Sequence, residues 1–205
     1  MVTLSKSRIE ALSDGVFAIA MTLLVLKLEV PEHQHSNEEM LRQLLDLRPQ
    51  FMSYVVTFLI AGGFWFLHHL TFHFIRNVNG FLVWVNLLFL MFVSLLPFSA
   101  GLMGHLFMHP VSQLFYFGNQ LAISLLLNLH WQYARRKGLI IETNAPEAER
   151  ISLRIGLTAA VFAVCMVTAI LSPEYSWAPL WLLVLGFVIE RVRRRRRHEN
   201  SSTEP

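Results

Sequence analysis

Six stretches of this 205-residue chain are apolar over about the length of a membrane-spanning helix. Because a helix rises about 1.5 Å per residue, about 20 apolar residues are needed to cross a hydrocarbon core of about 30 Å. The stretches lie at about 8–30, 51–75, 81–104, 111–133, 152–171 and 177–192. We therefore expect an all-α membrane protein with six transmembrane helices in one domain, residues 1–192. A basic and then polar tail, residues 193–205, follows it.

Composition agrees with a membrane location. Hydrophobic residues make up 54% of the chain and charged residues only 15%, whereas soluble domains carry about 25% charged residues. The single cysteine, Cys165, excludes an internal disulfide and any multi-cysteine metal site. The first segment carries Arg8, Glu10 and Asp14, which is not typical of a cleaved signal peptide.

The distribution of basic residues predicts the orientation. Of the 17 Lys and Arg residues, 14 fall on one side of the six segments and three on the other. The three are Lys27, Arg42 and Arg48; the others are Lys6, Arg8, Arg76, Arg135, Arg136, Lys137, Arg150, Arg154, Arg191 and Arg193–Arg197. Since basic loops stay in the cytoplasm, both termini are expected there.

The arginine run near the C-terminus has two interpretations. It could bind RNA or anionic lipid, or it could be a basic flank that holds the last helix in place. We favour the flank, and we expect membrane lipids but no nucleic acid among the partners.

The first segment is the least regular of the six. Its uninterrupted apolar run, Gly15–Leu26, has 12 residues and so covers only about 18 Å. To span, the helix must bring Arg8–Asp14 or Lys27–Glu29 into or near the bilayer. Ionisable side chains at that depth are costly unless they face protein or water, and they mark functional or tightly paired regions. The simpler alternative is that Arg8 reaches the interface and Asp14 caps the helix.

A helical projection at 100° per residue divides this segment into two faces. Asp14 and Glu10 lie nearly opposite an apolar stripe. The stripe consists of Leu12, Gly15, Ile19, Thr22, Leu23, Leu26 and Val30. Periodicity alone leaves open whether the stripe lines a pathway or faces lipid. In both cases Asp14 is expected to point into the protein, where it needs a partner such as Arg8 or a histidine of the second segment.

The sequence RIEALSDG at Arg8–Gly15 resembles the RxxxFSDG signature of the transmembrane protein 175 family, the potassium channels of lysosomes and their prokaryotic relatives. Arg8, Ser13, Asp14 and Gly15 match the signature, and Leu12 replaces the usual Phe with another apolar side chain. FWFLHH at Phe64–His69 and NLLFLMFVSLLPFS at Asn86–Ser99 extend the resemblance over most of the chain.

The resemblance implies a cation channel that is a homotetramer, with the first helix of each chain lining a central pore. It implies weak selectivity for potassium over sodium without a TVGYG filter, and no Gly-Tyr-Gly occurs in this chain. By position, Ile19 with Leu23 and Leu26 would form the hydrophobic constriction, and Thr22 would favour potassium. The permeant ion would be potassium, no cofactor would be needed, and the bacterial inner membrane would be the location.

A structural network is expected to hold the first helix in register. We expect His68 or His69 to bond to Asp14 and Arg8, and Trp65 to pack against the same helix. The full set of expected network residues is Arg8, Ser13, Asp14, Gly15, Trp65, His68 and His69.

Other chemistry finds little support. His69 and His73 have an i, i+4 spacing that some metal sites use, but no third ligand is near, so no metal site is expected. No GxSxG, HExxH or CxxC motif occurs, so an enzyme is not expected. The alternative function is a proton-coupled secondary transporter that uses Asp14 and the membrane histidines.

Three smaller expectations concern local structure. Pro97 should kink the third helix, because it cannot donate a backbone hydrogen bond. Asn86 and the other membrane amides are expected to serve packing or subunit contacts. The amphipathic loop Glu32–Arg48 is expected to form a short surface helix.

Overall fold

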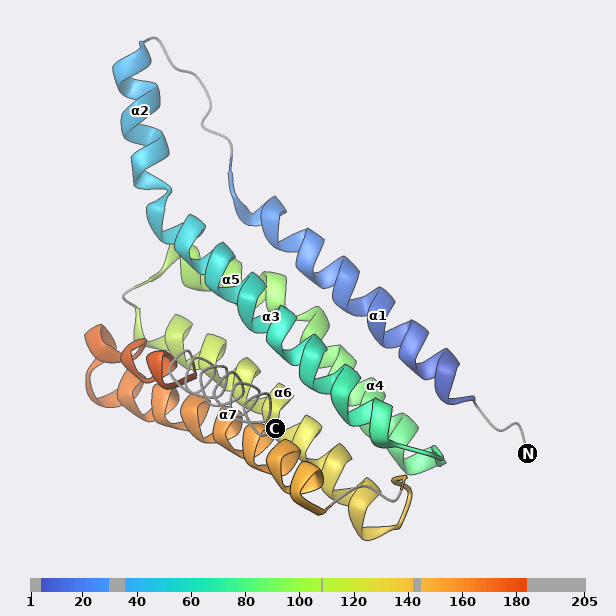
Figure 1. The fold of residues 1–205 in the computed structure, drawn as a ribbon. Helices are drawn as coiled ribbons and strands as arrows, with labels where there is room; N and C mark the ends of the chain where they lie inside the picture. The colour runs from blue at the N-terminus through green and yellow to red at the C-terminus, as the bar shows by residue number, and fades with distance from the viewer. Residues whose placement is uncertain (1–4, 30–35, 108, 142–144, 184–205) are drawn as a thin grey trace, which may run out of the picture.

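The computed structural model describes residues 5–29, 36–107, 109–141 and 145–183, which fold into α-helices and short 3-10 helices (Figure 1). Within these ranges there is no β-strand, and one isolated bridge joins Ile75 to Ile140. The elements are α1 (Lys6–Leu23), η1 (Leu24–Lys27), α2 (Asn37–Asp46), α3 (Arg48–Phe74), α4 (Gly80–Ser94), α5 (Leu96–His105), α6 (Pro110–Arg136), α7 (Ala145–Leu171), η2 (Pro173–Tyr175) and η3 (Ala178–Leu180).

Four stretches of the described chain are long and apolar enough to cross a membrane: 6–27, 48–74, 80–105 and 146–171. Helix α6 is as long as α3, with 27 residues in each, but it is more polar, because amides and histidine interrupt its apolar residues. The sixth predicted segment, 177–192, and the tail, 193–205, lie largely outside the described residues, which end at 183. The all-helical class is therefore confirmed, while six crossings stay a prediction.

The helices run alternately up and down, so the bundle has two ends, which we name after residues of α1. The Lys27 end contains the starts of α3 and α6 and the ends of α5 and α7, and the Lys6 end contains the ends of α3 and α6 and the starts of α4 and α7 (Figure 1). Helix α1 lies at one side of the bundle and the α6–α7 hairpin at the other, with α3, α4 and α5 between them (Figure 1). One long face of α1 therefore lies at the edge of the protomer.

Helix α1 packs on its own protomer through a single narrow face. Its buried residues are Ile9, Ser13, Phe17 and Ala20, followed by Leu24 in η1. They recur every three or four positions, which places them on one side of a helix with 3.6 residues per turn. Phe17 lies 5.9 Å from Phe89 of α4 between ring centroids, so aromatic packing anchors the middle of α1.

The third predicted segment is interrupted rather than continuous. α4 ends at Ser94, α5 begins at Leu96, and Leu95 lies between them. Pro97 lacks the N–H that would bond to the carbonyl of Val93, and its ring collides with that carbonyl in a regular helix. The chain responds with a tighter turn in which Leu95 N–H donates to Phe92 O at 3.2 Å. The kink expected at Pro97 is confirmed, and it takes the form of a break between α4 and α5.

The amphipathic loop does form a helix, α2, as expected. Ser36 caps it by accepting a hydrogen bond from the backbone N–H of Glu39 at 3.2 Å, the usual role of serine at this position. None of its side chains is buried, and it projects beyond the other helices at the Lys27 end (Figure 1).

Candidate functional site

The stripe predicted on α1 is the face that α1 does not bury in its own protomer. The exposed fractions are 47% for Leu12, 60% for Ile19, 41% for Leu23 and 71% for Leu26. Gly15 and Thr22 on the same face are exposed as well. Leu12, Gly15, Ile19, Thr22 and Leu26 alternate spacings of three and four, the pattern of helices that pack side by side around a shared axis.

Thr22 supplies the hydroxyl of this stripe. Its Oγ1 donates within α1 to the carbonyls of Ala18 and Ile19, at 2.9 Å to each. Because a hydroxyl has one proton and two lone pairs, a proton engaged by the helix leaves the oxygen free as an acceptor. Thr22 therefore presents an acceptor on an otherwise apolar face.

Gly15 has no steric reason within the protomer to be glycine. A Cβ built on it meets no other atom within 4 Å, and the residue lies inside a regular helix. In contrast, a Cβ on Gly104 of α5 would lie 3.1 Å from the backbone Cα of Gln50.

The second face of α1 is bonded to α3 by Trp65 and Asp14. The indole Nε1–H of Trp65 donates to Oδ1 of Asp14 at 2.8 Å. The ring of His69 stacks on Trp65, with 5.8 Å between centroids and 25° between planes. Trp65 is 40% exposed, so this bond lies at the edge of the protomer.

A buried chain of hydrogen bonds joins α1 to α4 and α3. His68 Nε2 and Oδ1 of Asn86 are 2.8 Å apart, and Nδ2 of Asn86 donates to Oγ of Ser13 at 3.2 Å. Ser13 in turn donates to the carbonyl of Ile9 at 2.9 Å. Because a carbonyl oxygen only accepts, His68 is the donor and carries its proton on Nε2. All three side chains are almost fully buried, so each polar group here needs its partner.

The structure places the predicted network residues differently from the expected pairing. Asp14 accepts its bond from Trp65, not from a histidine, and its side chain is exposed rather than turned into the bundle. His68 bonds to Asn86 instead. Arg8 is exposed near the start of α1. The expected tie from a histidine to Asp14 and Arg8 is therefore wrong in this protomer.

The expectation that Asn86 serves helix packing is confirmed, because its amide is the centre of the buried chain that joins α4 to α1 and α3. The available signal was its position: it is the single polar residue between Phe81 and Val93 in an apolar segment. An amide at such a depth is costly unless bonded. Its side-chain amide has an oxygen that accepts and a nitrogen that donates, so it can bridge Ser13 and His68.

Stacked rings extend from this chain across the bundle. His68 lies between Phe89, at 5.2 Å, and Phe72, at 4.5 Å, and Phe72 stacks in turn on His130 of α6 at 4.9 Å. The stack connects α4, α3 and α6, so the residues that hold α1 are themselves fixed by the rest of the bundle.

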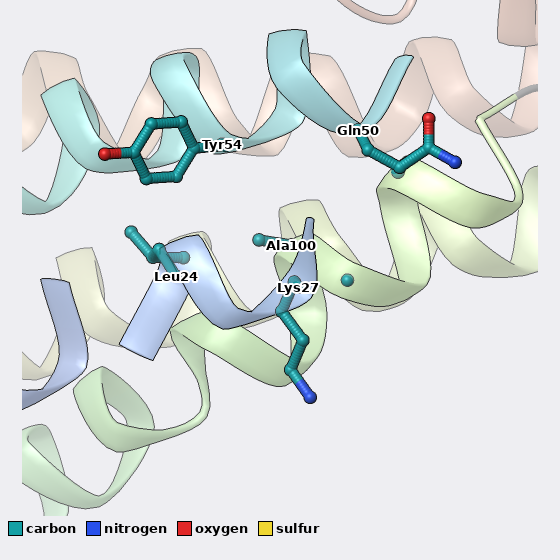
Figure 2. A pocket seen from close by; sticks show the side chains of 7 residues that line it. Leu24, Lys27, Gln50, Tyr54 and Ala100 are labelled. Atoms are coloured by element: carbon teal, nitrogen blue, oxygen red, sulfur yellow. The ribbon is translucent and has the colours of Figure 1, made fainter. Parts of the chain in front are cut away.

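A small pocket lies at the Lys27 end, between η1, the start of α3 and α5 (Figure 2). Lys27, Gln50 and Tyr54 line it beside the glycine face of α5. No group of three or more His, Cys, Asp or Glu side chains in the described ranges is arranged to hold a metal ion.

Comparison with known proteins places these features in a family. The sequence profile described as endosomal/lysosomal potassium channel TMEM175 matches residues 8–97. A potassium channel of Chamaesiphon minutus is 31% identical over 189 residues, which cover 89% of this chain and 93% of that one. A potassium channel of Streptomyces collinus is 30% identical over 191 residues, with 90% and 92% covered.

The fold agrees with the sequence match. A crystal structure described as a lysosomal potassium-selective channel TMEM175 homolog from Chamaesiphon minutus has a TM-score of 0.78 and 29% identity to this chain. The superposition covers 90% of this chain and 97% of the other. The family is one of ion channels rather than of enzymes, and the relatives from Chamaesiphon minutus and Streptomyces collinus, matched over 93% and 92% of their length, are bacterial proteins. The chain is thus a multi-pass membrane protein that belongs to the TMEM175 family of potassium channels.

Proposed function

We propose that this protein is a homotetrameric cation channel, weakly selective for potassium over sodium, in which four α1 helices line a central pore. The observation that carries the proposal is the division of α1 into two faces. One face is fixed to α3 and α4 through Asp14 and Ser13. The other is an exposed apolar stripe at the edge of the protomer, which four copies around an axis would enclose.

The constriction consists of Ile19, Leu23 and Leu26. Four copies of each would form stacked apolar rings along the axis, and a narrow apolar ring can exclude water and so close a pore without a charged gate. The heptad-like spacing of the stripe supports this arrangement, because it keeps the same face toward the axis over several turns.

Selectivity arises at Thr22. Its proton is engaged by carbonyls of its own helix, so the oxygen that it turns outward can replace part of the hydration shell of a cation. A ring of four neutral hydroxyls has a weaker field than rings of carboxylates, and preference for potassium over sodium is therefore moderate.

The hydrogen bonds behind the stripe keep it in register. Because Ser13 is bonded through Asn86 and Asp14 to Trp65, rotation of α1 about its axis would break both contacts. Contacts within each protomer thus fix the orientation of the stripe, and the four stripes together form the closed ring.

The Lys6 end faces the cytoplasm, and the protein resides in a bacterial inner membrane with six crossings and both termini inside. In the described part, eight basic residues lie at the Lys6 end and three at the Lys27 end, which agrees with the positive-inside rule. The eight are Lys6, Arg8, Arg76, Arg135, Arg136, Lys137, Arg150 and Arg154; the three are Lys27, Arg42 and Arg48.

A flux assay in proteoliposomes tests the proposal against a proton-coupled transporter. Potassium or sodium gradients are imposed, and cation and proton fluxes are recorded together. A channel gives flux that follows the electrochemical gradient of the cation without fixed proton movement. Saturable cation flux tied stoichiometrically to protons would overturn the channel proposal and favour the transporter.

A further inference from the structure

We propose that an anionic phospholipid binds along α4, with its phosphate headgroup at a basic corner formed by Arg76, Arg136 and Lys137 and its acyl chains on an exposed apolar stripe of α4. This inference goes beyond the proposed channel function. It takes from that proposal only the orientation of the chain, which puts the Lys6 end at the cytoplasmic leaflet, where anionic lipids give the surface a negative potential.

Backbone pairing brings Arg76 to the end of α6. Its N–H donates to the carbonyl of Leu139 at 2.7 Å, and the N–H of Ile141 donates to the carbonyl of Phe74 at 2.8 Å. The loops that leave α3 and α6 are therefore joined at the Lys6 end of the bundle (Figure 1). The side chain of Arg76 is exposed. Because Lys137 precedes Leu139 by only two residues, the basic residues of both loops belong to one corner of the protomer.

The turn after α6 holds the other two basic residues at the surface. Gly138 has a φ of 63°, which side chains with a Cβ adopt only at a cost. The chain turns there so that the N–H of Leu139 donates back to the carbonyl of Ala134 at 2.9 Å. Arg136 and Lys137, just before the turn, are both exposed.

The start of α4 lies against the same end of α6. The ring of Phe81 is 4.3 Å from that of Tyr133 between centroids, and Nδ2 of Asn79 donates to the hydroxyl of Tyr133 at 3.0 Å. Arg136 and Lys137 follow Tyr133 by three and four positions, so they lie about one turn beyond it on the same side of the helix. The basic corner is therefore next to the first turn of α4.

An exposed apolar stripe runs along α4 from this corner. It consists of Phe81, Trp84, Leu88 and Met91, whose exposed fractions are between 45% and 69%. At about 1.5 Å per residue the stripe is about 15 Å long, half of a hydrocarbon core of about 30 Å and so the depth of one leaflet. Its two aromatic residues lie at the basic end, and aromatic residues are enriched at the headgroup level of membrane proteins.

Carboxylates are absent from the helices that form this surface. The sequence has no Asp or Glu between Asp46 and Glu142, a range that includes α3, α4, α5 and α6 in full. The acidic residues described nearest the Lys6 end lie on α1 and α7. They are Glu10, which is 3.8 Å from Lys6, and Glu147 and Glu149.

An anionic phospholipid matches both parts of the surface. Its acyl chains cover the apolar side chains of one leaflet, and its phosphate carries the charge that the basic corner lacks. Basic pockets between membrane helices on the cytoplasmic side bind anionic headgroups in this way. A second copy of the chain would bring no carboxylate from its own α3, α4, α5 or α6 to this corner.

Native mass spectrometry of the full chain in detergent tests the proposal. The protein is titrated with equal amounts of dioleoyl phosphatidylglycerol, which is anionic, and dioleoyl phosphatidylcholine, which is zwitterionic. The wild type should bind the anionic lipid in preference. Arg136→Gln combined with Lys137→Gln should reduce this preference by about fivefold for each charge removed, and Arg76→Gln alone by about fivefold.

Lys6→Gln combined with Arg150→Gln is the matched control, because it removes two charges from the same end but from α1 and α7. Its lipid preference should equal that of the wild type. The arginine run at 193–197 is the same in all variants and adds the same background. An equal loss in the control, or an unchanged preference in the Arg136 and Lys137 double variant, would overturn the inference.

Two further readouts separate the lipid from other occupants. Glycerol 3-phosphate has the phosphate without acyl chains, and at the lipid concentration it should not displace bound phosphatidylglycerol. Displacement would reveal a site for free anions and overturn the lipid assignment. Fewer tetramers with an unchanged lipid preference in the Arg136 and Lys137 double variant would assign this face to subunit contact instead. None of these readouts requires cation flux, so failure of the channel proposal would leave them unaffected.

Discussion

Trp65 and Asp14 join the exposed edge of α3 to α1, with 2.8 Å between the indole Nε1 and the carboxylate Oδ1. Both residues belong to the rim of the protomer rather than to its core, since Trp65 is 40% exposed and Asp14 is exposed. The bond therefore positions α1 at the surface where, in the proposed tetramer, neighbouring protomers meet.

Trp65→Phe keeps an aromatic ring for His69 to stack on and removes the donor to Asp14. We expect a loss of about 1–2 kcal/mol in the free energy of unfolding, the range for a hydrogen bond to a charged group, reduced by exposure. Thermal unfolding in detergent, followed by circular dichroism, measures it. Trp84→Phe is the control, because Trp84 is 69% exposed on α4, and equal midpoints for the two variants would contradict the prediction.

The Ser13–Asn86 bond should show coupling in a double-mutant cycle. Asn86→Leu leaves the buried groups of Ser13 and His68 without this partner, and we expect a loss of about 1–3 kcal/mol. Ser13→Ala alone should cost less, because it leaves only the Nδ2 donor of Asn86 without its partner, whereas Asn86→Leu removes the partner of both Ser13 and His68. In the double variant the loss should be smaller than the sum, because the shared bond is counted twice. Additive losses in the same unfolding assay would show that the two residues act independently.

Much of the fold follows from the sequence because spanning a membrane restricts the chain so strongly. Length and apolarity identify helices α1, α3, α4–α5 and α7, and the α1 stripe emerges from periodicity alone. Helix α6 was predicted as well, as the segment 111–133, and it extends over Pro110–Arg136. What the sequence does not reveal is how its polar side chains are accommodated: within the described residues, both amide atoms of Gln120 and both ring nitrogens of His130 are buried without a hydrogen-bond partner.

The partners of the site residues were less predictable. A helical projection places Asp14 and Ser13 on α1, but which side chain reaches them depends on the rotation of α3 and α4 about their own axes. At 100° per residue, His68 and His69 lie only about 60° and 40° around α3 from Trp65, so a small rotation of α3 decides which of these side chains faces Asp14. Likewise, the contact between Lys27 and Gly101 joins residues far apart in sequence, and a glycine in an apolar helix carries no sign of what lies above it.

Ile19→Asn tests the constriction. A polar side chain in the proposed apolar constriction would keep the pore hydrated, so potassium flux through proteoliposomes should rise several-fold. Leu59→Asn on α3, a residue that is 69% exposed, is the control for a polar change elsewhere on the surface. If the two variants conduct alike, the pathway does not follow this stripe.

Thr22 is tested by the ratio of potassium to sodium permeability, taken from reversal potentials under bi-ionic conditions. Thr22→Ala removes the oxygen acceptor, and the ratio should fall toward unity. Thr22→Ser retains a hydroxyl that can donate to the same carbonyls, and it should keep most of the preference. A preserved ratio in Thr22→Ala would place selectivity elsewhere.

Two glycine-to-alanine substitutions should act at different levels. Gly104→Ala places a Cβ 3.1 Å from the backbone of Gln50, so the protomer should lose stability despite the better helix propensity of alanine. Gly15→Ala meets no atom of the protomer within 4 Å, so unfolding should be unaffected or slightly more difficult. Its effect should appear in assembly, as fewer tetramers by native mass spectrometry; unchanged assembly would argue against close contact at Gly15.

The interruption at Leu95 has a mechanical consequence. Asn86 of α4 holds the Lys6 half of α1, whereas Gly101 of α5 seats the Lys27 end. Because the regular helical hydrogen bonding is interrupted between α4 and α5, the two helices can change their relative angle at Leu95, and the contacts of Asn86 and Gly101 with α1 can move separately. A tilt of α5 can therefore move one end of α1 while the other end stays in place, and the two ends of the proposed pore need not widen together.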